Sequence, residues 1–552
     1  MRLGLAIPSS HAPGSSSHAH PSRQSSCPTA HNNSSSSAAS WEQQQAPAED
    51  AKASACIKKP IRSRSFLFWL LGRGRGPLPP IFTLPALVLD PGPLPVDVES
   101  HVLPGRPTFR YWIDFQVLNS PSSAALLERA FRMVGGVCTG GPAKMHKSAA
   151  ALQKCKDYGY MHMGEWDVLW SITAKAMLAA EILRPGQLVG ILPGFLCITR
   201  KTSLVRSLRT VYGDTCAFTI VPRTFKLPEE LDDWADWISK HSQEDTGLWM
   251  LKNNKQRGTG LRLVRTCDAF AACFETTKRP GLEGVMLYRW YLAQQYISKP
   301  LLIDGCKFGV RVWVLVPELV PLRAYMHVNG LVLFSSQRYD INDAASADAE
   351  VAPGHLTNYA QNEDGTVWSL GQLATHMGRG PFGALWQDMQ RSTAMVLAAA
   401  LPRALEVQAQ MLLPPHSCFQ FFGLDFLVDS CCKTWLLEVN ATPSMKVEHA
   451  EPATERMIHG QKWPVIQDMV HMLGICPERF HSPPLKPHKD LNFLPSELQR
   501  RGGFVPLMHL FPEETPDGMR ILPWHPLDQQ MRAWCRTGAY MQHACPVHPA
   551  CR

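Results

Sequence analysis

The sequence predicts an α+β fold with antiparallel sheets. Segments in which apolar and polar residues alternate are interspersed with segments that have apolar residues at helical spacing. Neighbouring strand candidates such as Phe421–Val428 and Thr434–Val439 are joined by short turns, which favour antiparallel pairing. The chain has 552 residues, of which 45% are hydrophobic and 18% charged, so it can form the cores of several domains.

The first hundred residues differ from the rest in composition. The first forty are rich in Ser, His and Ala, and no acid occurs before Glu42. The basic run Lys58–Arg75 and the proline-rich Pro77–Pro95 follow. This composition predicts a disordered, low-complexity linker over residues 1–103. An organelle transit peptide is the alternative interpretation. A secretory signal is not expected, because no continuous apolar core is present.

Charge and cysteine content limit the classes of protein that fit. The formal net charge of +8 favours acidic partners and does not demand nucleic acid. Sixteen scattered cysteines are too few for a disulfide scaffold and indicate reduced thiols in a cytosolic setting. We expect no membrane-spanning helix, because no run of 18 apolar residues occurs.

In the first half of the globular region, short strands are expected to alternate with helices. Phe109–Val117 alternates apolar and polar residues and predicts a strand, whereas Ser123–Gly135 has one apolar face and predicts a helix. The other elements expected before residue 300 are the strands Asp167–Trp170, Leu248–Lys252 and Leu287–Ile297 and the helices Arg200–Tyr212 and Trp234–His241.

The second half begins with the strongest strand signal of the chain, Lys307–Val316, in which valines alternate with other residues. The dipeptide Asn329-Gly330 between two apolar runs predicts a hairpin with a type I′ turn. A long helix is expected over Ala384–Leu412, with an interruption at Pro402. The two apolar strands Phe421–Val428 and Thr434–Val439 follow this helix.

A glycine-containing loop follows the strand that ends at Lys252. It includes Arg257, Gly258 and Gly260. Glycines let backbone amides approach phosphate oxygens, and the lysine supplies positive charge. The loop lacks the Gly-Lys-Ser/Thr of a Walker A motif, and a surface hairpin with solvated basic residues is the alternative.

Carboxylates lie inside two apolar strands near the end of the region. Asp425 interrupts one strand, and Glu438 and Asn440 end the next at positions i and i+2, so these two side chains face the same way. A buried carboxylate is costly unless it is paired or binds a cation, and three oxygen ligands suit Mg²⁺. A buried salt bridge to Lys307 or Arg311 is the alternative.

The residues after 480 are rich in Pro and His, and we expect a mobile tail there. His543, Cys545, His548 and Cys551 could ligate zinc, although their spacing fits no strong template.

Taken in order, these segments resemble the tubulin tyrosine ligase-like family of ATP-grasp ligases. The two most specific motifs are Phe422-Gly423-Leu424-Asp425-Phe426 and Glu438-Val439-Asn440-Ala441-Thr442-Pro443-Ser444. The other matching stretches are residues 199–205, 218–226, 249–261, 294–297, 300–303, 307–316, 355–359 and 368–370. The resemblance covers about residues 105–480.

The resemblance implies an ATP-grasp fold with an N-terminal lobe (104–195), a central lobe (196–297) and a C-terminal lobe (298–480), followed by the tail (481–552). It implies ATP and Mg²⁺ as cofactors. The residues that it assigns to ATP are Lys201, Lys252, Arg257, Gly258 and Gly260 at the phosphates, Gln294, Gln295, Tyr296 and Ile297 at the adenine, and Lys307. It assigns Mg²⁺ to Asp425, Glu438 and Asn440, and it places Arg311 and Lys201 at the reacting groups.

Four positions depart from the family pattern. Gly309 replaces an acid, Leu333 replaces an arginine that helps to bind the anionic substrate, Glu363 replaces a lysine, and Asn253 replaces a proline. The set that would bind magnesium is intact.

The resemblance implies a ligase that activates a carboxylate of the acidic tubulin tail as an acyl phosphate and joins it to a free amino acid. Glutamate is the preferred donor, with tyrosine and glycine as alternatives. A catalytically weak tubulin-binding relative is the second class, and it would explain the departures. The implied location is the cytoplasm and the cytoskeleton, including the cilium or basal body.

Overall fold

The computed structural model describes residues 107–113, 121–140, 166–171, 180, 183–241, 247–253, 260–278, 286–342, 351–357, 365–516, 518 and 525–538. They all belong to one compact unit, Gly74–Arg552. The linker predicted for residues 1–103 lies outside them. Within the described part, no helix is both long and apolar enough for a membrane span.

The first sheet is parallel. Its strands, in spatial order, are β2 (Gly136–Gly140), β1 (Phe109–Ile113), β3 (Val168–Trp170) and β4 (Leu188–Val189). Helix α2 (Pro121–Met133) links β1 to β2 and buries its apolar face, as its spacing predicts. The expectation of antiparallel sheets is wrong here. A helix in the connection carries the chain back to the same end of the sheet, which permits parallel pairing.

The second sheet is antiparallel and has the order β5 (Thr224–Lys226), β10 (Leu292–Gln295), β6 (Leu248–Lys252) and β7 (Leu261–Arg265). Helices α8 (Leu231–Lys240) and α9 (Thr266–Cys273) pack against it. The core between them is aromatic and includes Phe225, Trp234, Trp237 and Trp249. A two-stranded ribbon of β8 (Thr276–Lys278) and β9 (Met286–Tyr288) adjoins this region.

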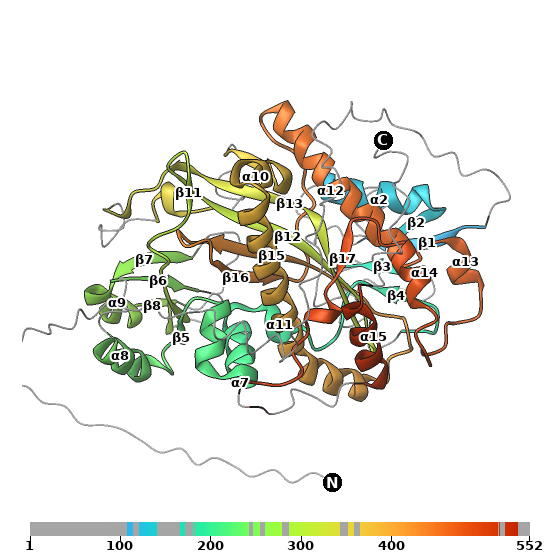
Figure 1. Ribbon diagram of the computed structural model, residues 1–552, viewed down its shortest axis with the longest axis horizontal. Coiled ribbons are helices and arrows are strands. Elements are labelled where there is room, and N and C mark those ends of the chain that lie inside the picture. The colour runs from blue at the N-terminus through green and yellow to red at the C-terminus, as the bar shows by residue number, and fades with distance from the viewer. Residues whose placement is uncertain are drawn as a thin grey trace, which may run out of the picture. The chain divides into compact units, whose positions relative to one another are not determined.

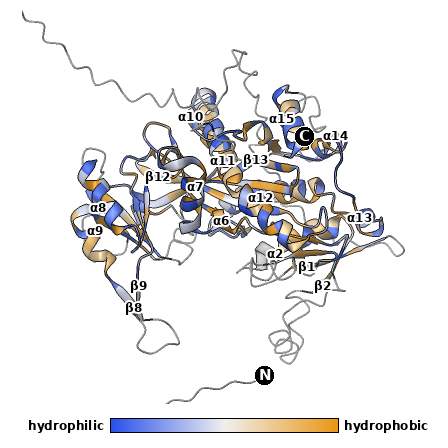
Figure 2. Cartoon of the chain, turned by 90° about the horizontal axis from the view of Figure 1, so that it is seen from below, coloured by the Kyte–Doolittle hydropathy of each residue, from blue (hydrophilic) through white to orange (hydrophobic). Residues whose placement is uncertain are grey.

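The third and largest sheet is also antiparallel. Its main path runs β14 (Val367–Ser369), β13 (Leu322–Arg338), β12 (Cys306–Leu319), β15 (Gln420–Val428) and β16 (Thr434–Asn440). Strand β11 (Leu302–Ile303) pairs with β12, and β17 (Phe504–Pro506) pairs with β13. Figure 2 shows hydrophobic residues along these strands, whereas α8 carries hydrophilic stretches.

Long helices cover this sheet (Figure 1). Helix α11 (Arg379–Met411) contacts β12 and β16, and α7 (Lys201–Ile220) packs against α11 and β16. Helices α10 (Leu370–Met377) and α12 (Pro452–Met472) contact β13 and β14. The shorter helices in the described part are α6 (Leu196–Thr199), α13 (Pro477–His481), α14 (Leu494–Gln499), α15 (Pro526–Arg536) and the 3₁₀ turns Pro353–His355 and Met508–Leu510.

The hairpin turn predicted at Asn329-Gly330 is wrong. Both residues lie inside β13, and the turn between β12 and β13 is formed by Val320 and Pro321 instead. Gly330 pairs with Val312 across the sheet, and a Cβ added to it would lie 2.6 Å from the backbone oxygen of Arg311. The glycine is therefore explained by close approach within the sheet rather than by a turn.

Two further boundaries differ from the sequence prediction. Helix α11 continues through Pro402, where an interruption was expected. Burial of the helix before this residue, up to Leu401, and of Ala404 after it offsets the local cost of a proline, which is about 3 kcal/mol. The strand expected at Leu287–Ile297 is divided into β9 and β10 by an irregular segment around Trp290.

The segment after residue 480 was expected to be a mobile tail, and this is corrected for its described residues. Strand β17 pairs with β13, and α14 brings Glu497 into an ion pair with the buried Arg323. Helix α15 brings Asp528 to the backbone amide of Leu322, a hydrogen bond of 2.6 Å. His543, Cys545, His548 and Cys551 lie outside the described residues.

Candidate active site

Strand register brings four of the predicted site residues onto one face of the large sheet. Arg311 on β12 lies opposite Asp425 on β15, and Asp425 lies opposite Glu438 on β16. Asn440 follows two residues after Glu438 and therefore points to the same face. Three antiparallel strands thus present one guanidinium, two carboxylates and one carboxamide side by side.

These groups are joined by hydrogen bonds. Arg311 binds Asp425 with two nitrogens, and its Nη2 lies 2.7 Å from Oδ2. The amide nitrogen of Asn440 donates to Asp425 Oδ2 at 3.1 Å and to Glu438 Oε1 at 3.2 Å. The salt bridge that the sequence left as an alternative for Asp425 is therefore present with Arg311. This salt bridge does not use all the lone pairs of the two carboxylates, so further oxygen lone pairs remain at the site.

The two carboxyl groups differ in their electrostatic surroundings. Burial raises the pKa of Asp425 to about 6, against the opposing effect of Arg311. Burial also opposes ionisation of Glu438, but the positive charge of Lys201 holds the pKa of that carboxyl below its ordinary value. Glu438 is therefore the firmly ionised member of the pair.

Two lysines from other elements approach this face. Lys201 is the first residue of α7 and lies close enough to Glu438 and Lys252 to shift the pKa of each. Lys252 ends β6, is buried, and donates to Gln294 Oε1 at 2.5 Å. Burial, and then Lys201, lowers the pKa of Lys252 to about 7. An anion bound beside this buried amine would stabilise its charged form.

Lys307 occupies a second buried position nearby. Its ammonium group donates to the hydroxyl of Tyr296 and to the backbone oxygen of His355, both at 3.0 Å. Burial, and then the positive charge of Lys252, lowers the pKa of Lys307 to about 7. The amide nitrogen of Gln294 donates to Thr224 at 2.9 Å, which ties β10 to β5.

Gln295 and Ile297 line a cavity of about 190 Å³. Phe218, Arg223 and Trp435 lie on its other sides, and the guanidinium of Arg223 lies 4.5 Å from the centre of the Phe218 ring. Flat aromatic and guanidinium surfaces around a small cavity are suited to a planar ring.

The predicted phosphate loop is described only at its ends. Asn253 donates its backbone amide to the oxygen of Gly260 at 3.0 Å, and Gly260 has a positive φ of 70°. Arg257 and Gly258 lie outside the described residues, as does Glu363.

Two of the departures from the family pattern lie beside Arg311. Gly309 is two residues before it on β12 and pairs with Leu333 of β13, so both positions belong to the face that carries Arg311. A Cβ added to Gly309 would lie 3.0 Å from the hydroxyl of Thr357. Leu333 is buried. This edge of the site is therefore apolar.

The sequence analysis missed Lys462. This buried lysine of α12 donates to the backbone oxygen of Lys446, and burial, followed by the charge of Arg311, lowers its pKa to about 7. A lysine in the otherwise apolar spacing around Ile458, Val465 and Ile466 was the available signal.

Comparison with known proteins establishes the family to which the chain belongs. The model of the tubulin-tyrosine ligase family matches residues 181–479, more than half of the chain, and the chain belongs to this family. It is 30% identical over 305 residues to tubulin polyglutamylase TTLL13 of Homo sapiens, covering 51% of this chain and 35% of the relative. It is 25% identical over 338 residues to probable tubulin polyglutamylase TTLL2 of Homo sapiens, covering 56% and 51%. It is 28% identical over 314 residues to a probable beta-tubulin polyglutamylase of Tetrahymena thermophila, covering 52% and 24%. The matches therefore span between about a quarter and half of the relatives' length.

Proposed function

We propose that the protein is an ATP-dependent ligase that adds glutamate to the acidic C-terminal tail of tubulin. The observation that carries this proposal is the grouping of Arg311, Asp425, Glu438 and Asn440 on one sheet face in a member of the tubulin-tyrosine ligase family. The polyglutamylase names of its relatives favour tubulin as acceptor and glutamate as donor.

The proposal gives the three sheets the roles of ATP-grasp lobes. The boundaries are 104–195, 196–297 and 298–480, with β17 and its neighbouring described residues added to the third lobe, and ATP lies between the central and C-terminal lobes. Lys201 and Lys252, with Arg257, Gly258 and Gly260, hold the phosphates. Gln294 to Ile297 meet the adenine, beside the cavity lined by Gln295 and Ile297, and Lys307 supports this wall.

The donor set of Asp425, Glu438 and Asn440 fits Mg²⁺. Two carboxylates supply hard oxygen ligands, and Asn440 adds its amide oxygen once the carboxamide, whose nitrogen now faces the carboxylates, turns over. A magnesium ion that keeps several waters needs no larger set. Asp425 shares its oxygens with Arg311, but each carboxylate oxygen has a second lone pair. Bound there, the ion would neutralise charge on the phosphates of ATP.

The reaction has two steps. A carboxylate oxygen of the acceptor forms a bond to the γ-phosphorus while the bond to the β,γ-bridging oxygen breaks, which gives an acyl phosphate and ADP. The amine of glutamate then forms a bond to the acyl carbon, phosphate leaves, and the amine loses a proton to solvent. Lys201, Lys252 and Arg311 lower both barriers by positioning the anionic groups and offsetting their charge.

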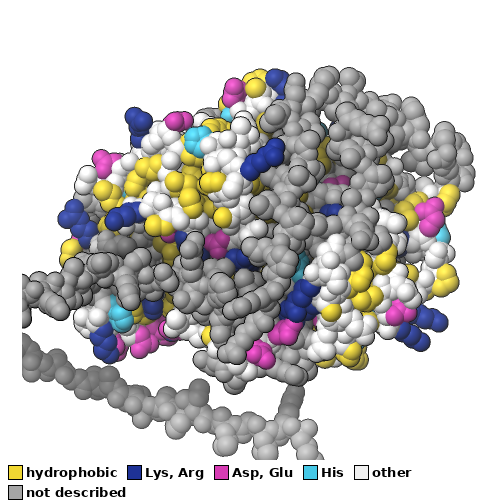
Figure 3. Space-filling model, viewed as in Figure 1, with side chains coloured by type: hydrophobic (Ala, Val, Ile, Leu, Met, Phe, Trp, Pro, Cys, Tyr) yellow, Lys and Arg dark blue, Asp and Glu magenta, His cyan; other side chains and the backbone are white. Residues whose placement is uncertain are grey.

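The acceptor is an acidic peptide, which the formal net charge of +8 favours weakly. On the face drawn in Figure 3, basic and acidic side chains are interspersed over the described residues. This face shows no broad basic surface among the described residues, and the proposal places acceptor recognition at the site. The cytoplasmic cytoskeleton, including the cilium or basal body, is the proposed location.

The test is incorporation of labelled glutamate, glycine and tyrosine, each in a separate reaction, into microtubules with Mg-ATP. Glu438→Gln serves as the blank. Label from glutamate alone, absent in the blank, is the expected result. Label from glycine or tyrosine instead would keep the ligase and replace the donor. Label that persists in the blank would contradict the proposed site.

A catalytically weak tubulin-binding relative is the second candidate. The observation that favours it is the apolar edge formed by Gly309 and Leu333 beside Arg311. This candidate predicts that the protein co-sediments with microtubules and transfers none of the three amino acids. A Leu333→Arg variant that gains transfer would identify the missing cation as the reason.

A further inference from the structure

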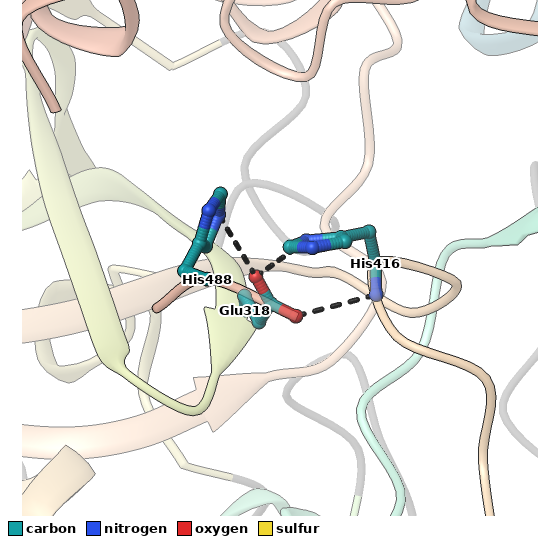
Figure 4. A group of neighbouring side chains, drawn as sticks. All are labelled: Glu318, His416 and His488. Atoms are coloured by element: carbon teal, nitrogen blue, oxygen red, sulfur yellow. Dashed lines mark hydrogen bonds and ion pairs between the residues drawn. The ribbon is translucent and has the colours of Figure 1, made fainter. Parts of the chain in front are cut away.

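A second group of chemically active side chains lies away from the candidate active site. Glu318 near the end of β12, His416 in the connection from α11 to β15, and His488 after α13 converge (Figure 4). Their side chains are 13%, 8% and 20% exposed, so all three are largely withdrawn from solvent. Glu318 follows Arg311 by seven residues on the same strand, which separates the two groups by roughly 23 Å.

The distances suit a small cation bound by all three groups. One ligand atom from each residue can be chosen such that all lie within 4.8 Å of one another. Glu318 Oε2 lies 2.7 Å from His416 Nδ1 and 3.8 Å from His488 Nε2. Zinc bonds near 2 Å at tetrahedral angles place ligand atoms roughly 3.3 Å apart. Small side-chain movements would therefore bring these atoms to zinc geometry.

The second ring nitrogen of His416 is also fixed. Nε2 lies 2.9 Å from the backbone oxygen of Lys486, so it carries the hydrogen of that bond. A neutral ring would present a lone pair of Nδ1 to the carboxylate of Glu318, and either a proton or a metal ion at Nδ1 removes this repulsion. Metal-bound histidines commonly donate their other nitrogen to a backbone carbonyl in this way.

Charges around the group are nearly balanced. Arg323 donates to Glu318 Oε2 at 2.6 Å, but it also pairs with Glu497. Arg479 donates to the backbone oxygens of Leu473 and His416. Glu318 and Glu497 together offset these two guanidinium groups, so a divalent ion would not meet a strong excess of positive charge. Arg323 takes one lone pair of Oε2, and the other faces His416 Nδ1 at 2.7 Å, where a bound ion would replace the direct contact. Oε1 accepts the backbone amide of His416 at 3.2 Å.

We propose that Glu318, His416 and His488 form a zinc site that fastens residues 482–490 to the large sheet. Two imidazoles and one carboxylate are a common zinc donor set, and the fourth position is left to water. Most residues from Ser482 to Lys489 are exposed, so zinc would add a fixed point to a segment with little buried surface. Zinc would thereby tie the C-terminal segment, including α14 and β17, to the end of β12.

The first experiment measures zinc in the full-length protein after dialysis against chelator and re-addition of one equivalent of Zn²⁺. The variants are His488→Ala, which removes a ligand, and His488→Cys, which keeps a zinc-binding atom. The matched control is His471→Ala, an exposed histidine of α12 outside the group. Wild type, His488→Cys and the control should retain about one zinc per chain, and His488→Ala should lose at least tenfold in affinity.

Hydrogen exchange distinguishes zinc at this site from zinc bound elsewhere on the chain. Zinc should slow exchange in residues 482–490 of wild type and of the control, and it should have no such effect in His488→Ala. Equal zinc retention by His488→Ala would assign the metal to another site, such as Cys545 and Cys551, and would overturn the proposal. So would the absence of stoichiometric zinc in wild type, which would leave Glu318 and His416 as an ion pair alone.

Discussion

Glu438 is the residue at which the proposed chemistry can be separated from the fold. It is ionised under the influence of Lys201 and accepts one hydrogen bond from Asn440. We predict that Glu438→Gln lowers turnover by a factor on the order of 10² to 10³. The amide keeps the size of the side chain and removes the charge that a magnesium ion requires.

Steady-state ATP consumption with microtubules and glutamate measures this effect. Glu406→Gln is the matched control, because Glu406 is an exposed partner of Arg403 on α11. The thermal midpoint should be nearly unchanged in both variants. Wild-type turnover in Glu438→Gln would remove this residue from the metal site.

The buried lysines lead to a prediction about protons. Burial lowers the pKa of Lys252 and of Lys307 to about 7, so at pH 8 both are largely neutral in the free protein. Phosphate beside an amine favours the charged form and raises its pKa. ATP binding at pH 8 should therefore be accompanied by proton uptake, and the share of this uptake that the two amines supply should vanish towards pH 6, where both are already charged.

Calorimetry at pH 8 in buffers of different ionisation enthalpy measures this uptake. Lys252→Met should take up about one proton fewer than wild type. Magnesium is left out so that metal binding displaces no protons, and pH 8 lies well above the pKa of Asp425, which is about 6. Identical uptake in the two proteins would show that Lys252 does not meet the phosphates.

Sequence reasoning identified the polar residues of this site better than their contacts. Asp425 and Glu438 stand out because carboxylates are rare within apolar strands. The ion pair between Arg311 and Asp425 depends on the register between β12 and β15, which are more than a hundred residues apart, and no local pattern encodes it. Lys462 was missed for the same reason, because its helix reaches Arg311 only through tertiary packing.

At the level of secondary structure, Gly330 distinguishes a turn from a close contact inside a strand. A Cβ there would lie 2.6 Å from both the backbone oxygen of Arg311 and Leu370 Cδ1. We predict that Gly330→Ala lowers the free energy of unfolding by about 1–3 kcal/mol. Denaturant unfolding of the purified protein measures the loss.

Gly380→Ala is the control for this substitution. Gly380 lies in the first turn of α11, and nothing lies within 4 Å of an added Cβ. Alanine there should be neutral or slightly stabilising, because it favours the helix. A neutral Gly330→Ala would indicate that β13 is not continuous at this position.

Elements were predictable where the pattern is local and strong. The strands Leu248–Lys252 and Lys307–Val316 and the helix Trp234–His241 are confirmed within one or a few residues at each end. Asn329-Gly330 was misassigned because a dipeptide typical of turns also suits a crowded strand. Pro402 was misassigned because the burial of α11, which no local rule contains, outweighs the cost of proline.

For the molecule as a whole, the described part of the C-terminal segment belongs to the fold. Its composition does not reveal this, because its contacts are with β13 and, through His488 and Glu318, with β12, far away in the sequence. Arg323 is 5% exposed and Glu497 is 6% exposed, and Glu497 also accepts a hydrogen bond from the hydroxyl of Tyr325. Glu497→Gln should therefore lower the free energy of unfolding by roughly 3 kcal/mol. Glu406→Gln, which loses an exposed ion pair, should change it by less than about 1 kcal/mol.

Removal of each end of the chain tests which end belongs to the fold. Loss of residues 481–552 would leave Arg323 without Glu497, expose the edge of β13 that β17 covers, and uncover Leu322 at α15. We predict insoluble or unfolded protein, because a buried charge and a strand edge would both lose their partners. Loss of residues 1–100, which are poor in the patterns that form a core, should leave the thermal midpoint within about 2 °C of wild type. A folded, soluble 1–480 fragment would show that the fold does not require the C-terminal segment. Loss of soluble protein on removal of 1–100 would show that the linker prediction is wrong.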